Sequence, residues 1–418
     1  MASLEAVRRK TLAFLDERDS AILGLACDLI AAPSPNLPGD ETAPAAVVHE
    51  AIASLGLGPS RVVAMEPHRP NLLITIDSGR PGPRLGICGH LDTKPVGEAA
   101  NEWKTDPFTP VVDGDRLYGL GSTDMKGAVA AMVFAAAAVA AGGGPPAGSL
   151  TLILTADEEY GSAKGAEYLV KQRALDLDAI VLGEPCGVHE EWDAIRIVSR
   201  GISCFKISVH GTQMHSSISD QIESVNAVEA MARILARLRS ELALTYSEHP
   251  LCHEGPTVNI GVKAQGGVGF GVLPGFAEFW SDIRTIPGMT QVQLGKDVEA
   301  ALQRLHHEAL GATMSMEFAD HLAWIAPTEV PVDHLVVRAC QTAAATVLGS
   351  SPPLAGFPGA SDAWPFQGIG GIPTIAAFGP GLLPLAHGPN EWVSTQSVLQ
   401  AAQMYALLAL DFCAGPSV

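Results

Sequence analysis

The sequence predicts an α/β protein with a mostly parallel sheet flanked by helices (the first domain) and a smaller inserted domain. Two patterns indicate this fold class. Over residues 1–194, short apolar runs alternate with helical patterns, as in parallel strands joined by crossover helices. Over residues 195–319 the order becomes strand, helix, strand, strand, helix, strand, which is that of a ferredoxin-like unit. At 418 residues the chain is also long enough for two domains.

The first domain is predicted to open with helices and then to alternate strands with helices. The predicted helices are Glu5–Ala31, Thr42–Leu55, Ala128–Ala141 and Gly161–Arg173, and the predicted strands are Asn71–Ile76, Arg84–Cys88, Ser149–Thr155 and Ala179–Leu182. The alanine-rich helix is apolar, but it is too short and too weakly hydrophobic to span a bilayer. We therefore expect it to be a buried core helix, ended by the glycines and prolines of residues 142–146.

The inserted domain is predicted to hold four strands and two helices. These are strands at Phe205–Val209, Pro256–Lys263, Gly275–Thr285 and Ala312–Phe318, and helices at Ser224–Leu242 and Gln291–Ala309. The first domain then resumes with a helix at Val332–Leu348, a strand at Pro373–Phe378 and a closing helix at Thr395–Phe412. We expect one domain from residues 1–194 and 320–418 and a second from residues 195–319.

Composition limits the classes of partner. The formal net charge of −19 argues against nucleic acid or an anionic membrane as the main partner. The seven cysteines show no CxxC spacing, and several lie in apolar runs where a thiol is usually a small core residue. Residues 1–19 lack the apolar core of a signal peptide. We therefore expect a cytoplasmic protein with a small-molecule substrate and no nucleic-acid or membrane partner.

Acidic and imidazole side chains recur where predicted strands end. His90 follows one strand, Glu158 and Glu159 follow a second, and Glu184 follows a third. Asp124 and His387 lie in glycine-rich loops. Because the carboxyl ends of parallel strands meet at one edge of a sheet, these residues are expected to converge. Taken singly, each carboxylate has a simpler interpretation as a solvated turn residue, and His90 as a strand cap.

A donor set of imidazoles and carboxylates without thiolates suits two divalent ions that share one carboxylate. Zinc accepts such ligands, and cobalt or manganese are alternatives. In the pair Glu158-Glu159, one residue can bind a metal while its neighbour stays free as a general base for hydrolysis. Asp92, two residues after His90, is a candidate orienting group that accepts the ring N–H not facing the metal.

Several blocks resemble one enzyme family in their order along the chain. They are Gly89-His-Leu-Asp-Thr-Lys-Pro-Val-Gly97, Arg116-Leu-Tyr-Gly-Leu-Gly-Ser-Thr-Asp-Met-Lys-Gly127, Asp157-Glu-Glu-Tyr-Gly161, Gly183-Glu-Pro185, His210-Gly-Thr-Gln-Met-His-Ser-Ser217, Gly359-Ala-Ser-Asp362 and His387-Gly-Pro-Asn-Glu391. Together they resemble the M20 metallopeptidases, which include acetylornithine deacetylase, succinyl-diaminopimelate desuccinylase, aminoacylase and carboxypeptidase G2. Each block is weak alone, but together they cover nearly the whole chain.

The resemblance implies a role for each candidate residue of the first domain. Asp124 would bridge the two metals. His90 and Glu184 would hold one ion, and Glu159 and His387 would hold the other. Glu158 would be the general base, and Asp92 would support His90.

The resemblance also implies that the inserted domain is a lid that forms a homodimer. His215 would reach the partner subunit's site and stabilise the oxyanion, although it has a simpler interpretation as a loop histidine. Asn259 and Arg284 would bind a substrate carboxylate, but Arg284 could equally be an ion-paired strand residue. The segment Gly269-Phe-Gly-Val-Leu-Pro274 departs from the family's Asn-x-x-Pro and leaves the specificity open.

The expected reaction is two-metal hydrolysis of the amide bond in an N-acyl amino acid. The alternative within the same chemistry is a di- or tripeptidase or a glutamate-type carboxypeptidase. A serine hydrolase is an alternative from a different class, because Gly359-Ala-Ser-Asp-Ala363 resembles a nucleophile elbow. The segment lacks the last glycine of that motif, and a serine hydrolase would leave the metal-type residues unexplained. A nucleotide-binding loop at Gly119-Leu-Gly121 is disfavoured, because it lacks the third glycine and a strand directly before it.

Overall fold

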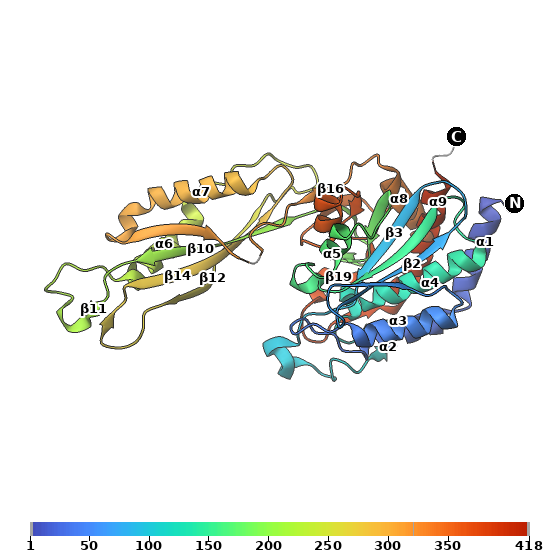
Figure 1. Ribbon diagram of the computed structural model, residues 1–418, viewed down its shortest axis with the longest axis horizontal. Helices are drawn as coiled ribbons and strands as arrows, with labels where there is room; N and C mark the ends of the chain where they lie inside the picture. The colour runs from blue at the N-terminus through green and yellow to red at the C-terminus, as the bar shows by residue number, and fades with distance from the viewer. Residues whose placement is uncertain (1–2, 321, 416–418) are drawn as a thin grey trace. The chain divides into compact units, whose positions relative to one another are not determined.

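The computed structural model describes residues 3–320 and 322–415. It divides into two compact units (Figure 1): unit 1 holds residues 1–199, 328–357 and 361–418, and unit 2 holds residues 200–327 and 358–360. Residues 1, 2, 321 and 416–418, which the predicted first domain includes, lie outside the described residues. The predicted boundaries at 195 and 319 differ from this division. The cause is strand β9 (Ile195–Ser199), which pairs with strands β16 (Thr328–Glu329) and β17 (Leu354–Phe357) in unit 1.

The main sheet of unit 1 has six strands. In spatial order they are β1 (Arg61–Ala64), β2 (Pro70–Asp77), β6 (Ser149–Thr155), β3 (Arg84–His90), β7 (Ala179–Leu182) and β18 (Thr374–Ile375). Strands β6, β3, β7 and β18 run parallel, whereas β2 runs antiparallel to both of its neighbours. The sheet is therefore mixed, with most strands pointing one way. His90 pairs with Thr155, so β3 and β6 end side by side.

The core of unit 1 forms around α4 (Gly127–Gly142), the predicted alanine-rich helix. Nearly all of its side chains are buried, because α1 (Leu4–Asp16), α2 (Asp19–Ile30), α9 (Thr395–Ala414) and the sheet surround it. α4 and α9 are apolar enough to cross a membrane by composition, but 89% and 72% of their apolar windows are buried. Core packing therefore accounts for their apolar composition. The helices α3 (Thr42–Ser54), α5 (Ala166–Lys171) and α8 (Leu335–Leu348) complete the unit.

Short strands that periodicity did not predict connect the loops of unit 1. β4 (Val111–Asp113) and β5 (Arg116–Tyr118) form a three-stranded sheet with β20 (Trp392–Ser394), and β8 (Pro185–Gly187) pairs with β19 (Gly379–Leu382). Two predicted helices also differ. Glu5–Ala31 divides into α1 and α2 at residues 17 and 18. Gly161–Arg173 shrinks to α5, because Gly161 and Ser162 have positive φ angles that a helix does not accept.

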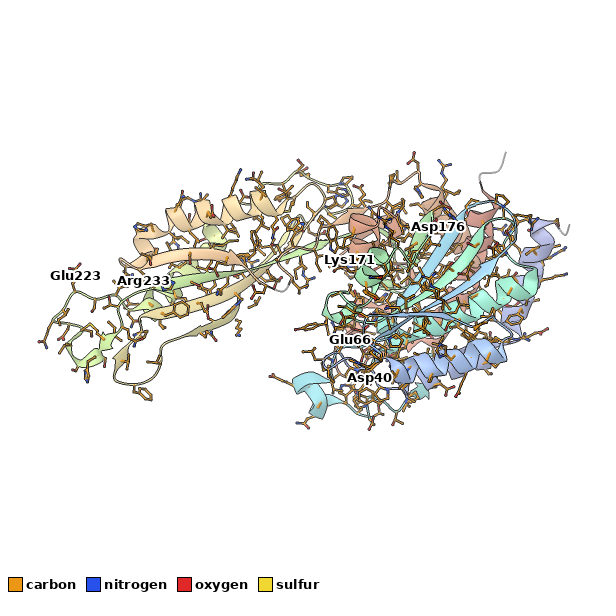
Figure 2. All side chains as sticks on the ribbon, in the orientation of Figure 1. Asp40, Glu66, Lys171, Asp176, Glu223 and Arg233 are labelled. Carbon is orange, nitrogen blue, oxygen red and sulfur yellow. The ribbon has the colours of Figure 1, made fainter. Side chains whose placement is uncertain are left out.

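Unit 2 follows the order β10 (Gly201–His210), α6 (Ala227–Glu241), β12 (Thr257–Gly266), β14 (Phe276–Thr285), α7 (Gln291–Arg304) and β15 (Thr313–Phe318). Its antiparallel sheet has the strand order β12-β14-β10-β15. α6 and α7 contact each other, and Phe205 and Phe279 are fully buried. A short pair of strands, β11 (Met214–His215) and β13 (Val272–Leu273), joins two loops. Charged side chains such as Lys171 on α5 and Arg233 on α6 lie on the surface of each unit (Figure 2).

We predict that Leu152→Ala, in the centre of β6, lowers the free energy of unfolding by about 2–5 kcal/mol, because it truncates a fully buried side chain on a strand that lies between β2 and β3. Val62→Ala, on the exposed edge strand β1 of the same sheet, is the matched control and should change it by less than about 0.5 kcal/mol. Urea unfolding followed by circular dichroism measures both. Equal effects of the two variants would contradict the assignment of β6 to the centre of the core.

Candidate metal centre

His90, Asp124 and Glu184 form one cluster at the ends of β3 and β7. His90 is the last residue of β3, and its Nε2 lies 2.9 Å from Asp124 Oδ1 and 3.8 Å from Glu184 Oε1. All three side chains are buried. The Nδ1 of His90 donates a hydrogen bond of 2.9 Å to the main-chain carbonyl of Asp92. Because a carbonyl oxygen can only accept, the neutral ring carries its proton on Nδ1, and the lone pair on Nε2 faces the cluster.

Asp124, Glu159 and His387 form a second cluster that shares Asp124 with the first. The Nε2 of His387 lies 3.1 Å from Asp124 Oδ2 and 3.2 Å from Glu159 Oε2. The two oxygens of the Asp124 carboxylate thus face different histidines. The side chain of His387 is 46% exposed, so this cluster opens to solvent, whereas the first is enclosed.

The donor sets fit divalent metal ions. In each cluster, one candidate ligand atom from each of the three residues lies within 4.8 Å of the others, and these are the two such groups among the described residues. The donors are imidazole nitrogens and carboxylate oxygens, a combination that zinc and other divalent transition metals accept. The five residues predicted as ligands are therefore the five that the structure brings together.

A buried carboxylate that is not a candidate ligand holds the turn that carries Asp124. Glu391 accepts hydrogen bonds from the main-chain N–H groups of Gly121 (3.0 Å), Thr123 (2.8 Å) and Asp124 (3.0 Å). Burial raises the pKa of Glu391 to about 8, although the N–H groups of Gly121 and Asp124 act to lower it. The N–H of Gly121, in the Gly119-Leu-Gly121 loop, is thus bonded to the protein's own carboxylate, which leaves it unavailable to a nucleotide phosphate.

Asp92 holds the turn that carries Glu158 and Glu159. Its two carboxylate oxygens accept the main-chain N–H groups of Glu158 (3.2 Å) and Glu159 (3.1 Å). The same carboxylate lies next to His90, with its Oδ1 3.6 Å from the ring Nδ1, and the two side chains interact. The hydrogen bond of 2.9 Å from Nδ1 goes to the main-chain carbonyl of Asp92. The supporting role of the Asp92 carboxylate for His90 stays a prediction.

A network of buried charges lies behind the same turn. The amide of Asn36 donates to Asp92 (2.9 Å) and to Asp157 (3.0 Å). Arg69, which is 1% exposed, donates to Asp157 (2.9 Å) and to Glu41 (2.7 Å). These bonds hold Asp157, the residue before Glu158, in the left-handed conformation that begins the turn.

Glu158 and Glu159 differ in their partners although they are neighbours. The main-chain N–H of Lys94 donates to Oε1 of Glu159 (3.1 Å), and its ammonium lies 3.3 Å from Oε2. Among the described residues, no hydrogen bond or ion pair engages the carboxylate of Glu158. Burial, with a contribution from the charge of Glu184, raises the pKa of Glu158. The geometry leaves this carboxylate available for proton transfer.

The pKa values of Glu184 and His387 are shifted because several carboxylates lie close together in the site. Burial raises the pKa of Glu184, and the charge of Asp124 raises it further. Burial lowers the pKa of His387, but hydrogen bonds to Asp124 and Glu159 outweigh this effect and raise it to about 11. A cation between these groups would relieve the repulsion.

The other three predicted site residues lie in unit 2. His215 is exposed on β11, and its Nδ1 accepts the N–H of Ser217 at 3.2 Å. Asn259 donates to Asp282 (3.0 Å), and the Nε of Arg284 lies 3.8 Å from the same Asp282 oxygen. Asn259 and Arg284 are therefore neighbours on one face of the unit 2 sheet, paired with an acidic residue of the chain itself.

Glu391 and Asp362 lie within the blocks that resemble the M20 family, but the sequence alone assigned them no role. Asp362 accepts the hydroxyl groups of Thr155 (2.9 Å) and Ser162 (2.5 Å), next to the end of β6. Their position inside the quoted blocks was the available signal. The neighbouring Ser361 is buried, and no histidine bonds its hydroxyl among the described residues. This geometry gives the serine-hydrolase alternative no base.

Comparison with known proteins decides the family. Residues 86–411 match the model of "Peptidase family M20/M25/M40". The chain belongs to this family. It is therefore a metal-dependent hydrolase that acts on carbon–nitrogen bonds.

Individual members of the M20 family resemble the chain over most of its length. It is 31% identical to an acetylornithine deacetylase of Proteus mirabilis over 346 residues, 82% of each chain. It is 30% identical to a succinyl-diaminopimelate desuccinylase of Parvibaculum lavamentivorans, covering 94% of this chain and 96% of the relative. A crystal structure of an M20 family metallo-carboxypeptidase from Sulfolobus solfataricus matches with a TM-score of 0.74 at 20% identity, covering 94% and 99% of the two chains. That structural likeness supports the fold alone.

Proposed function

We propose that the chain is a dinuclear metal-dependent deacylase that hydrolyses the amide bond of an N-acyl amino acid, as an acetylornithine deacetylase or desuccinylase does. The observation that carries the proposal is the Asp124 carboxylate, whose two oxygens face separate histidine–carboxylate pairs. Two relatives of about 30% identity, named as a deacetylase and a desuccinylase, support the choice of substrate class.

In this proposal each cluster holds one divalent ion. His90 and Glu184 would hold the first ion, Glu159 and His387 would hold the second, and Asp124 would be shared by the two. Zinc is the expected metal, with cobalt or manganese as alternatives. When bound, the ions polarise the scissile carbonyl and lower the pKa of the attacking water.

Glu158 is the proposed general base. Its carboxylate accepts a proton from the water as the water oxygen attacks the acyl carbon. The same proton then passes to the amine nitrogen as the carbon–nitrogen bond breaks. The second proton of the water also ends on the amine, so that a carboxylate and an ammonium ion leave. Asp92 keeps Glu158 and Glu159 in place through their main-chain N–H groups.

Unit 2 is proposed to act as a ferredoxin-like lid and as the contact surface of a homodimer. His215 would stabilise the oxyanion in the partner subunit's site, and Asn259 and Arg284 would bind the substrate carboxylate. Because Asp282 holds Asn259 and lies near Arg284, a substrate carboxylate would compete with Asp282 for them. A cytoplasmic location remains part of the proposal.

A peptidase with the same two-metal site is the second candidate. The description of the matching family model, "Peptidase family M20/M25/M40", favours it. Both reactions hydrolyse an amide and use the same residues, so the site geometry is common to them. The substrate decides between the two.

We predict that exhaustive chelation abolishes hydrolysis and that zinc or cobalt restores it. The restored protein should hydrolyse N-acetyl and N-succinyl amino acids faster than dipeptides in parallel assays of amine release. Full activity after chelation, with no ion found by elemental analysis, would contradict the metal site. Faster cleavage of dipeptides would select the peptidase alternative.

We predict that Glu158→Gln lowers kcat by roughly 10²–10⁴-fold, because the amide cannot accept the water proton. The metal content should remain near two ions per chain, because Glu158 is not a ligand in this scheme. Elemental analysis and initial rates test both parts, with Glu167→Gln on α5 as a matched control. Loss of one ion in Glu158→Gln would mean that Glu158 and Glu159 exchange roles.

We predict that His215→Ala is nearly inactive yet keeps its metals, because His215 lies outside both clusters. If His215 acts in the partner subunit, mixing His215→Ala with Glu158→Gln chains should restore part of the activity. Mixed dimers would then contain one intact site. His307→Ala, at a highly exposed histidine, is the control. No recovery after verified subunit exchange would exclude action across the dimer.

A further inference from the structure

Glu391 is a buried acidic residue that bonds to the main chain of Asp124. The proposed chemistry gives it no role. It is 1% exposed and accepts three main-chain N–H groups from residues 121–124. We propose that Glu391 is a positioning residue that holds the Asp124 carboxylate between the two metal clusters. The inference rests on the proposed two-metal site.

The turn needs such an anchor because its backbone is irregular. Gly121 has a φ of 79°, and Asp124 (φ −127°, ψ 87°) and Met125 (φ −141°, ψ 35°) depart from helical angles just before α4. Their N–H groups therefore lack the regular acceptors of a helix. A carboxylate offers only acceptors, with two oxygens and about four lone-pair sites, so it can satisfy several N–H groups at once. Satisfied in this way, the turn presents Asp124 in one orientation.

Glu391 also joins the segments that carry two ligands of the second cluster. It follows His387 by four residues, and its own carbonyl accepts the N–H of Gly119 at 3.0 Å. Next to it, the carbonyl of Trp392 accepts the hydroxyl of Thr123 at 2.6 Å. The loop of His387 and the turn of Asp124 are thus bonded through main chain and side chain. A shift at Glu391 would move the two ligands relative to each other.

A buried lysine next to the turn makes a further contact. The side chain of Lys126 is fully buried, and its Nζ donates to the carbonyl of Ala32 at 2.7 Å. This bond attaches the end of the turn, two residues after Asp124, to a different segment from the one that carries Glu391.

Glu391→Gln tests the inference, because the amide keeps the size of the side chain but turns an NH₂ group toward the turn. At metal concentrations that fill both clusters of the wild type, we expect the variant to hold about one ion per chain by elemental analysis. We also expect kcat to fall by on the order of 10²-fold, the typical effect of a displacement of about 1 Å. Asp297→Asn, at a buried carboxylate of unit 2 that accepts the N–H of Thr245, is the matched control.

Amide hydrogen exchange in the metal-free protein gives a readout that does not depend on the metal. Residues 119–127 should exchange faster in Glu391→Gln than in the wild type, with unit 2 unchanged. If Glu391→Gln does not fold, Glu391→Asp keeps the charge on a shorter side chain and should show the same changes to a smaller degree. Wild-type exchange in this segment, or two ions and a kcat within threefold of the wild type, would overturn the inference. A wild type without bound ions would instead refute the proposed function.

Discussion

The carboxylate of Asp124 is the constraint on which the rest of the site depends. Its Oδ1 lies 2.9 Å from the Nε2 of His90, and its Oδ2 lies 3.1 Å from the Nε2 of His387. The side chain must keep one orientation for both contacts to form at once. The fold therefore has to hold the backbone of Asp124 in place, and Glu391 accepts its main-chain N–H at 3.0 Å.

Two buried carboxylates that are not candidate ligands provide this support. Asp92 binds the N–H groups of the turn with Glu158 and Glu159, and Glu391 binds those of the turn with Asp124. Hydrogen bonds to a charged acceptor are stronger than neutral ones, which suits turns that must not move. Burying the Asp92 carboxylate costs desolvation energy, and the charge of the buried Arg69 offsets part of it. The positions of the candidate ligands therefore depend on hydrogen bonds to the main chain of these two turns as well as on the ligand side chains.

Much of the fold and the candidate site could be predicted because strong local patterns mark them. Strands β3, β6 and β7 are apolar runs: β3 ends at His90, and Glu158 and Glu184 follow the ends of β6 and β7. The antiparallel direction of β2, the short strands and the break between α1 and α2 could not be predicted, since partners distant in the sequence decide them. That Asp92 also offers its main-chain carbonyl to the His90 ring could not be predicted either, because the local backbone conformation decides it.

The sequence by itself determined the residue types at the ends of the strands, and with them a donor set of two imidazoles and three carboxylates without thiolates. It also marked Glu158 and Glu159 as neighbours with separable roles. Only the tertiary structure decided which of them is engaged, because Lys94 bonds to Glu159, whereas no hydrogen bond or ion pair engages the carboxylate of Glu158 among the described residues. The tertiary structure alone also showed that Glu391 accepts the main-chain N–H of Asp124. A carboxylate takes its function from the N–H groups and charges around it, and folding brings these together from distant segments.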